Sequence, residues 1–174
     1  MTDPVPWDEP LVMSAKKWIA EALAGWVQSD HAKVVTLAPI AAEPLTKAAL
    51  WHRNPVLLAP LDQNHSKSFL ALAAGSGLND PSLRTIGLAD ALDRLSQASG
   101  TALPINAKRK ARLIATRGGA LHIGQVAPAN AQHVLADVLT LFQWLADLMS
   151  INSQVLFGMR LSRVSWNLRW RSPA

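Results

Sequence analysis

"PLVMSAKKWIAEALAGWVQS", residues 10–29, decides the fold class of this 174-residue chain. Its apolar residues recur at helical spacing and form one broad stripe: Leu11, Val12, Ala15, Trp18, Ile19, Ala22, Leu23, Trp26 and Val27. Such a stripe predicts an amphipathic helix that packs on other elements, here from about Pro10 to Ser29.

A second long stripe runs through "ANAQHVLADVLTLFQWLADLMS", residues 129–150. It consists of Ala131, Val134, Leu135, Val138, Leu141, Phe142, Leu145 and Leu148. No segment alternates apolar and polar residues for long, as a half-buried strand would. We therefore expect an all-α fold, a helical bundle of about five helices.

The segment "HAKVVTLAPIAAEPLTKAALW", residues 31–51, is also helical in pattern but contains Pro39 and Pro44. Each proline removes a backbone donor and clashes with the preceding turn, so this segment predicts a kinked or two-piece helix. A short helix is expected from Ser66 to Ala74, before the "GSG" sequence that follows.

Capping residues mark two further helices. Thr85 is a suitable N-cap for "IGLADALDRLSQAS", and Gly100 is a suitable stop at its end. Asn106 is a suitable cap for the basic helix "AKRKARLIATR", residues 107–117.

Length and composition favour one domain, residues 11–150, between an acidic, proline-rich N-terminal extension (1–10) and a C-terminal tail (151–174). Apolar runs end well before the roughly 18 residues that a membrane span needs, so we expect no integral membrane association. The first ten residues lack the pattern of a secretory signal, which favours a cytoplasmic location. The absence of cysteine excludes disulfides, thiolate metal sites and thiol catalysis.

The tail "INSQVLFGMRLSRVSWNLRWRSPA" is basic and contains Trp166 and Trp170. Three interpretations stay open: a helix docked on the bundle or a loose terminus, a contact for nucleic acid or an anionic membrane, and a non-native end.

The formal charge is +5, and part of it is concentrated before the motif discussed below. The residues of this basic run are Lys108, Arg109, Lys110 and Arg112. They form either a solvated helix face or a surface that contacts RNA phosphates.

Most catalytic site types find no support. "GSGLND" lacks the lysine and hydroxyl of a phosphate-binding loop, and no strand precedes it. The five histidines never fall at a two-histidine metal spacing with an acidic partner, so we expect no metal and no cofactor. Asp90 and Asp93 beside Arg94 predict surface ion pairs.

The stretch "ATRGGALHIG", residues 115–124, contains Arg117 and His122 on either side of a glycine pair. A continuous helix would turn the two side chains apart, whereas a bend at Gly118–Gly119 would bring them to one cleft. Arginine can stabilise the charge of a phosphorane-like transition state, and histidine can transfer a proton near neutral pH. The alternative is structural: Gly118 is a helix C-cap, and His122 packs in the following turn.

The order of these features resembles the HEPN-domain proteins of bacteria: "IAAEPLTKAALW", then "LRTIGLADALDRLSQ", a basic helix leading into "TRGGALHIG", and a long apolar helix. The resemblance covers roughly residues 18–150 and implies a dimer with its cleft between the protomers. It also implies a metal-independent endoribonuclease of a toxin–antitoxin or other defence system. Arg117 and His122 match the arginine and histidine of the family motif, while Gly118 stands where the family usually has asparagine.

Two hypotheses about function follow. In the first, RNA lies on the basic run, His122 moves a proton at the 2′-hydroxyl, Arg117 stabilises the non-bridging oxygens, and an antitoxin is a partner. In the second, the chain is a non-catalytic HEPN-like module that binds RNA, a nucleotide or a protein; Gly118 favours this alternative. A purely structural scaffold would leave the basic run unexplained.

Overall fold

A computed structural model describes residues 10–61, 66–75, 83–123, 126–152 and 156; for residues 117–123 it describes the backbone alone. The predicted extension (1–10) and tail (151–174) lie almost entirely outside these residues, as do Trp166 and Trp170.

The described residues form six α-helices and one short 3-10 helix, with no strand among them, so the predicted all-α class is confirmed. In chain order these are α1 (Pro10–Val27), α2 (His31–Arg53), η1 (Pro55–Leu58), α3 (Ser66–Ala73), α4 (Leu88–Ser99), α5 (Ala107–Ile123) and α6 (Pro128–Leu148). The number of α-helices exceeds the expected five by one.

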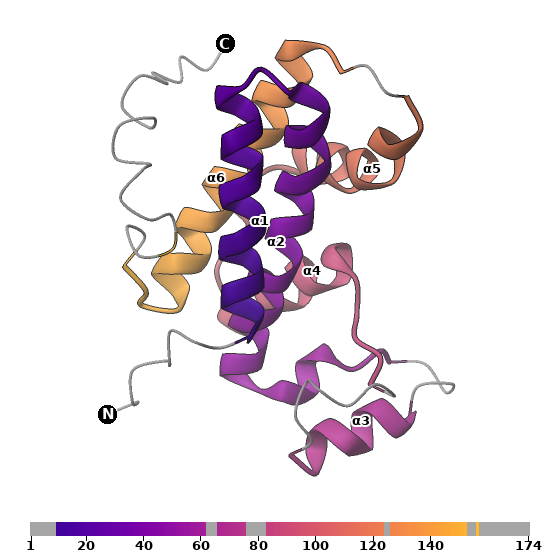
Figure 1. Cartoon of the computed structure of the whole chain (residues 1–174). Helices are drawn as coiled ribbons and strands as arrows, with labels where there is room; N and C mark the ends of the chain where they lie inside the picture. The colour runs from indigo at the N-terminus through magenta and orange to yellow at the C-terminus, as the bar shows by residue number, and fades with distance from the viewer. Residues whose placement is uncertain (1–9, 62–65, 76–82, 124–125, 153–155, 157–174) are drawn as a thin grey trace.

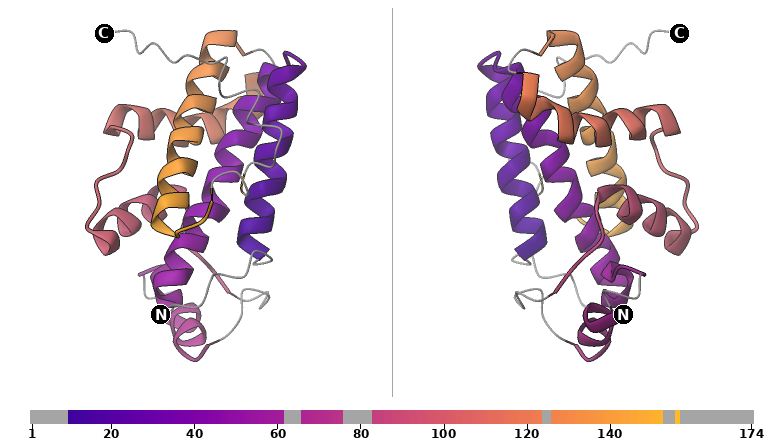
Figure 2. Two further views of the ribbon diagram at one scale, coloured as in Figure 1. Left: turned by 90° about the vertical axis from the view of Figure 1, so that its left-hand side faces the viewer. Right: turned by 90° about the vertical axis from the view of Figure 1, so that its right-hand side faces the viewer.

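Helix α2 is the centre of the bundle, because it packs against α1, α4, α5 and α6 (Figure 1). Helices α1 and α2 form an antiparallel pair, and α5 lies across α2 and α6 (Figure 2). Helix α3 packs on η1 at the end of the molecule away from the α1–α2 turn (Figure 1).

The predicted stripe of α1 is confirmed for most of its residues, with Val12, Ala15, Ile19 and Ala22 at most 1% exposed. Val27, the last residue of the stripe, is 70% exposed, so the prediction is wrong there. The α1–α2 turn follows, and the Asp30 side chain caps α2 by accepting a hydrogen bond from the backbone N–H of Lys33 at 3.0 Å.

An exposed ion pair also joins the two helices. The ammonium group of Lys33 donates to Oε2 of Glu21 at 2.6 Å. This hydrogen bond and the positive charge of Lys33 lower the pKa of Glu21 below its ordinary value.

Of the two forms predicted for residues 31–51, kinked or two-piece, the two-piece form is wrong, because one helix runs through Pro39 and Pro44. Each proline in a helix interior is unfavourable by about 3 kcal/mol. The burial of α2 offsets this, since Leu45 and Leu50 are 0% exposed and each such side chain contributes about 1.5–3 kcal/mol.

The start of α4 corrects a second prediction. Gly87, not Thr85, is the N-cap residue, and it makes no side-chain capping hydrogen bond. The hydroxyl oxygen of Thr85 instead accepts a hydrogen bond from Nζ of Lys47 at 2.9 Å. The next residue, Ile86, donates its N–H to the carbonyl of Leu58 at 3.0 Å, so this segment runs along η1 before α4 begins.

Other helix ends agree with the sequence. Helix α4 is followed by Gly100 in the left-handed region, at φ 65°, and α3 ends one residue before the predicted Ala74. The Asn106 side chain accepts a hydrogen bond from the backbone N–H of Arg109 at 2.9 Å, which confirms the cap of α5.

Helix α5 is longer than predicted and extends through Gly118 and Gly119 to Ile123. Gly118 is therefore not a helix C-cap in this structure. The stripe of α6 is confirmed, since seven of its eight members are buried and Leu148 packs partly buried against the core.

Candidate nucleic-acid interface

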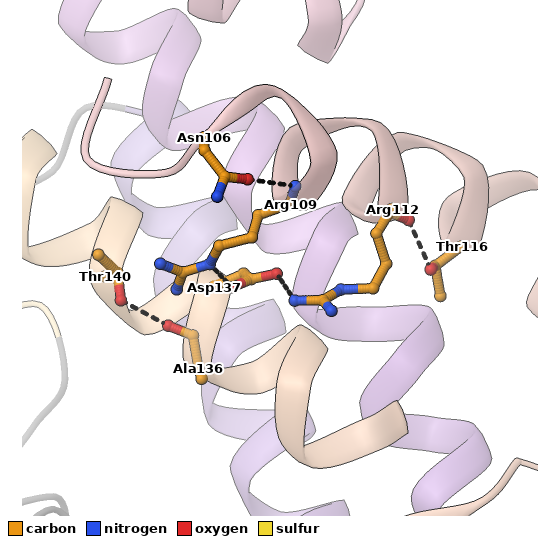
Figure 3. Close-up of polar contacts among 7 residues, drawn as sticks. All are labelled: Asn106, Arg109, Arg112, Thr116, Ala136, Asp137 and Thr140. Carbon is orange, nitrogen blue, oxygen red and sulfur yellow. Dashed lines mark hydrogen bonds and ion pairs between the residues drawn. The ribbon is translucent and has the colours of Figure 1, made fainter. Parts of the chain in front are cut away.

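The basic run occupies the first two turns of α5, directly after the Asn106 cap. Lys108 is exposed, while Arg109, Lys110 and Arg112 are partly buried. Residues three apart lie on the same side of a helix, so Arg109 and Arg112 project together. Their common direction is toward α6, where both contact one residue (Figure 3).

That residue is Asp137, whose side chain is 1% exposed. Nε of Arg109 donates to Oδ1 of Asp137 at 2.5 Å, and a terminal nitrogen of Arg112 donates to Oδ2 at 2.5 Å (Figure 3). The arginine side chains are 35% and 36% exposed, so each reaches from a buried carboxylate to the surface. We call these three residues the Asp137 cluster.

The Asp137 cluster joins α5 to α6, and the first half of α5 buries little apolar surface of its own. Leu113 is the one buried residue among positions 107–116 of α5. A buried carboxylate is strongly unfavourable unless it is paired and hydrogen-bonded. The two arginines supply both conditions, and they thereby fix the first half of α5 on α6.

Lys110 is paired separately. Its ammonium group lies 2.5 Å from Oδ1 of Asp93, which is on α4 and is 54% exposed. The sequence predicts that Asp93 forms a surface ion pair with Arg94 on α4. In the structure Asp93 is paired with Lys110 of α5 instead. Arg94 donates to the carbonyl oxygens of Leu57 at 2.9 Å and Ala59 at 2.6 Å, because it reaches the unpaired carbonyls at the end of η1.

Carboxylates thus accompany three of the four residues of the basic run. Asp137 and Asp93 together lower the formal charge of this region from four to two. Lys108 remains the exposed cation of the run. The run is consequently part ion-pair network and part surface, rather than the uniform ridge that the sequence predicts.

A second polar cluster lies on α2. Nζ of Lys47 is 2.7 Å from Oε1 of Glu43, and both side chains are nearly buried, at 13% and 14% exposed. The same ammonium group reaches Thr85. This cluster connects α2 to the segment before α4.

The structure places the backbone of Arg117 and His122 on the last two turns of α5. Their side chains lie outside the described part of the chain, so the structure does not test whether they share a cleft. On a straight helix a spacing of five residues separates two side chains by about 140°. The common cleft therefore still requires the bend that the glycine pair permits.

Asp137 is the site residue that sequence reasoning missed. Its signal was present, since it is the one acidic residue inside the stripe of "VLADVLTLF". An acidic residue at a buried position requires a basic partner, and the candidate partners lie 25 and 28 residues earlier in the chain.

No group of three or more histidine, aspartate or glutamate side chains within the described residues is arranged to hold a metal ion. The described helices include none that is long and apolar enough to cross a membrane. Comparison with known proteins gives no match to a family model, a curated protein or a solved structure.

Proposed function

We propose that this chain is a HEPN-like, metal-independent endoribonuclease with Arg117 and His122 as its catalytic pair. One observation carries the proposal: both residues belong to α5, the helix whose first half is fixed on α6 by the Asp137 cluster. A site that transfers protons needs such rigid support, because small displacements of the reacting groups are costly.

In this mechanism RNA lies along α5. His122 accepts the proton of the 2′-hydroxyl as the 2′-oxygen attacks the adjacent phosphorus, and the bond to the 5′-oxygen breaks. Arg117 stabilises the negative charge on the non-bridging oxygens. The 5′-oxygen takes a proton from water and leaves as a hydroxyl, His122 returns its proton to the solvent, and the other product carries a 2′,3′-cyclic phosphate.

Purified protein and single-stranded RNA in the presence of EDTA test this mechanism. We expect cleavage with cyclic phosphate ends, identified by mass spectrometry, and loss of cleavage in Arg117→Ala and His122→Ala. His133→Ala is the matched control, because His133 is an exposed histidine of α6 outside the motif. Cleavage by His122→Ala at the wild-type rate would remove the mechanism.

A homodimer with the cleft between protomers, and an antitoxin that restrains the activity, belong to the same proposal. Light scattering at high micromolar concentration measures the first, and a monomeric mass would count against it. Expression in a bacterial host measures the activity that such an antitoxin would restrain. Wild-type protein should slow growth and degrade RNA, and His122→Ala should not.

Gly118 favours a second candidate function, a HEPN-like module that binds RNA, a nucleotide or a protein without cleavage. The family usually has asparagine at this position, and glycine offers no side chain to orient the motif. Gly118→Asn separates the two candidates. An increase in cleavage supports the endoribonuclease, whereas RNA binding without cleavage in both proteins supports the module.

A further inference from the structure

We infer that Arg109 and Arg112 form a phosphate-binding subsite for single-stranded RNA and that Asp137 is the positioning residue that holds them. The inference rests on the proposed function for its substrate class. It changes the meaning of the basic run, because it assigns phosphate binding to two oriented guanidinium groups rather than to the sum of the charges.

Asp137 uses few of the donors that its two arginine partners offer. A guanidinium group has five N–H donors in a rigid plane. Within the described residues, each arginine donates one N–H to the carboxylate of Asp137. Nε of Arg112 is buried and has no hydrogen-bond partner among these residues. Because Nε of Arg112 is buried and Nε of Arg109 is engaged by Asp137, the donors left for another acceptor are terminal N–H groups of the two arginines.

Both arginines reach the surface beside the buried carboxylate. Asp137 approaches from the buried side, at 1% exposed, whereas a third of each arginine side chain is exposed. Both arginines bind the same carboxylate, one on each of its oxygens, and their guanidinium groups lie on either side of it (Figure 3). The exposed part of each arginine can consequently meet a phosphate group of RNA from the solvent side.

The charge of the Asp137 cluster favours an anionic acceptor. Two guanidinium groups and one carboxylate leave one net positive charge, which favours an anion. Paired planar donors match the oxygens of a phosphate group, which arginine recognises with directional hydrogen bonds. Lys110 differs, because its side chain is 16% exposed and its ammonium group is paired with Asp93. Orientation by Asp137 also lowers the entropy lost when RNA binds.

Two substitutions that remove the same charge separate orientation from charge. Asp137→Asn and Asp93→Asn each delete one negative charge beside α5. If charge alone binds RNA, both variants bind more tightly, because the positive potential rises. If Asp137 orients the subsite, Asp137→Asn weakens binding about tenfold, while Asp93→Asn changes it by about twofold or less.

Binding is measured by fluorescence anisotropy with a single-stranded RNA in the His122→Ala background, so that cleavage does not consume the probe. Far-UV circular dichroism and thermal unfolding establish that each variant is folded at the assay temperature.

Arg109→Lys and Arg112→Lys test the same point without removing Asp137. They keep the charge and lose the planar fork, so we expect about fivefold weaker binding for each. Arg53→Lys is the control, because Arg53 is an exposed arginine of α2 that binds the carbonyl of Ala98, and it should leave the affinity unchanged. These variants decide the question even where Asp137→Asn does not fold.

Equal or tighter RNA binding by Asp137→Asn, or unchanged affinity in both lysine variants, would overturn the subsite, and so would absent RNA binding by the wild-type chain. Failure of the proposed function gives a different result: RNA binding that depends on Asp137, Arg109 and Arg112, without cleavage by the wild-type chain.

Discussion

Removing both partners of Asp137 should destabilise the protein more than removing either one. In the double variant Arg109→Met and Arg112→Met, a carboxylate that is 1% exposed loses its ion pairs to both arginines, at 2.5 Å each. Breaking a buried ion pair by deleting one side costs about 3–5 kcal/mol. Each single variant should cost about 1–2 kcal/mol, because the arginines are a third exposed and solvent screens the remaining pair.

Urea unfolding followed by circular dichroism measures this effect. With a urea dependence of about 2 kcal/mol per molar, a loss of about 4 kcal/mol lowers the midpoint by about 2 M. Adding Asp137→Leu to the double variant should restore most of the stability, since apolar replacement of a whole buried ion cluster is often neutral or stabilising.

The triple variant decides whether the reasoning holds. If it is as unstable as the double variant, the loss comes from packing of the arginine stems rather than from an unpaired buried charge. A double variant that loses less than about 1 kcal/mol would likewise refute the buried-charge argument. Arg53→Met, at an exposed position on α2, is the control and should stay within about 0.5 kcal/mol of wild type.

Four further predictions concern stability. Asn106→Ala should lower the free energy of unfolding by about 1 kcal/mol through loss of the α5 cap, and Asn106→Asp should retain it. Gly100→Ala should lower the free energy of unfolding by about 1–2 kcal/mol, because Gly100 has a φ of 65°. Thermal unfolding measures the effects of the Asn106 and Gly100 variants. Phe142→Ala, at a position 0% exposed, should cost about 3–5 kcal/mol in urea unfolding. Lys33 lowers the pKa of Glu21 in the folded state, so the ion pair contributes to the free energy of unfolding above the unfolded pKa of Glu21. This contribution disappears as the pH falls through the folded pKa. Glu21→Gln should remove this pH dependence of the stability, and added salt should reduce it.

Features that depend on neighbouring residues in the chain were predictable from sequence. The stripes of α1 and α6 arise from a period of 3.6 residues, and this period predicts the burial of most of their members. Val27 is the exception, because it ends α1 and is 70% exposed. The Asn106 cap and the Gly100 stop are also local, because a side-chain oxygen and a positive φ act within one turn.

Features decided by distant contacts were not predictable in the same way. Pro39 and Pro44 are unfavourable for a helix, yet the bundle surrounds α2 and its burial outweighs the local preference. Thr85 has the chemistry of an N-cap, but Lys47 takes its hydroxyl and η1 takes the backbone beside it. In both places tertiary contacts override a correct local rule.

The basic run shows why a count of charges does not describe an electrostatic surface. Four cations in five consecutive positions predict a strong field, yet carboxylates from α4 and α6 engage three of them. The carboxylates lower the net positive charge, but they also fix the orientation of the side chains that they bind. A fixed guanidinium group presents its remaining donors at one angle, whereas a free one samples many. A field attracts any polyanion, whereas oriented donors discriminate between acceptors by geometry.

The same reasoning connects the Asp137 cluster to the candidate catalytic pair. Gly118 and Gly119 lie in the interior of α5, where each glycine is unfavourable by about 0.5–1 kcal/mol relative to alanine. Helical backbone at such positions needs support from elsewhere, and on the described part of α5 that support is the Asn106 cap, Leu113 and the ion pairs to Asp137. Packing of α5 against α2 adds to this support. Helix α5 therefore carries the candidate pair Arg117 and His122 on the same continuous helix that the Asp137 cluster anchors, and the proposed proton transfer would benefit from such rigid placement.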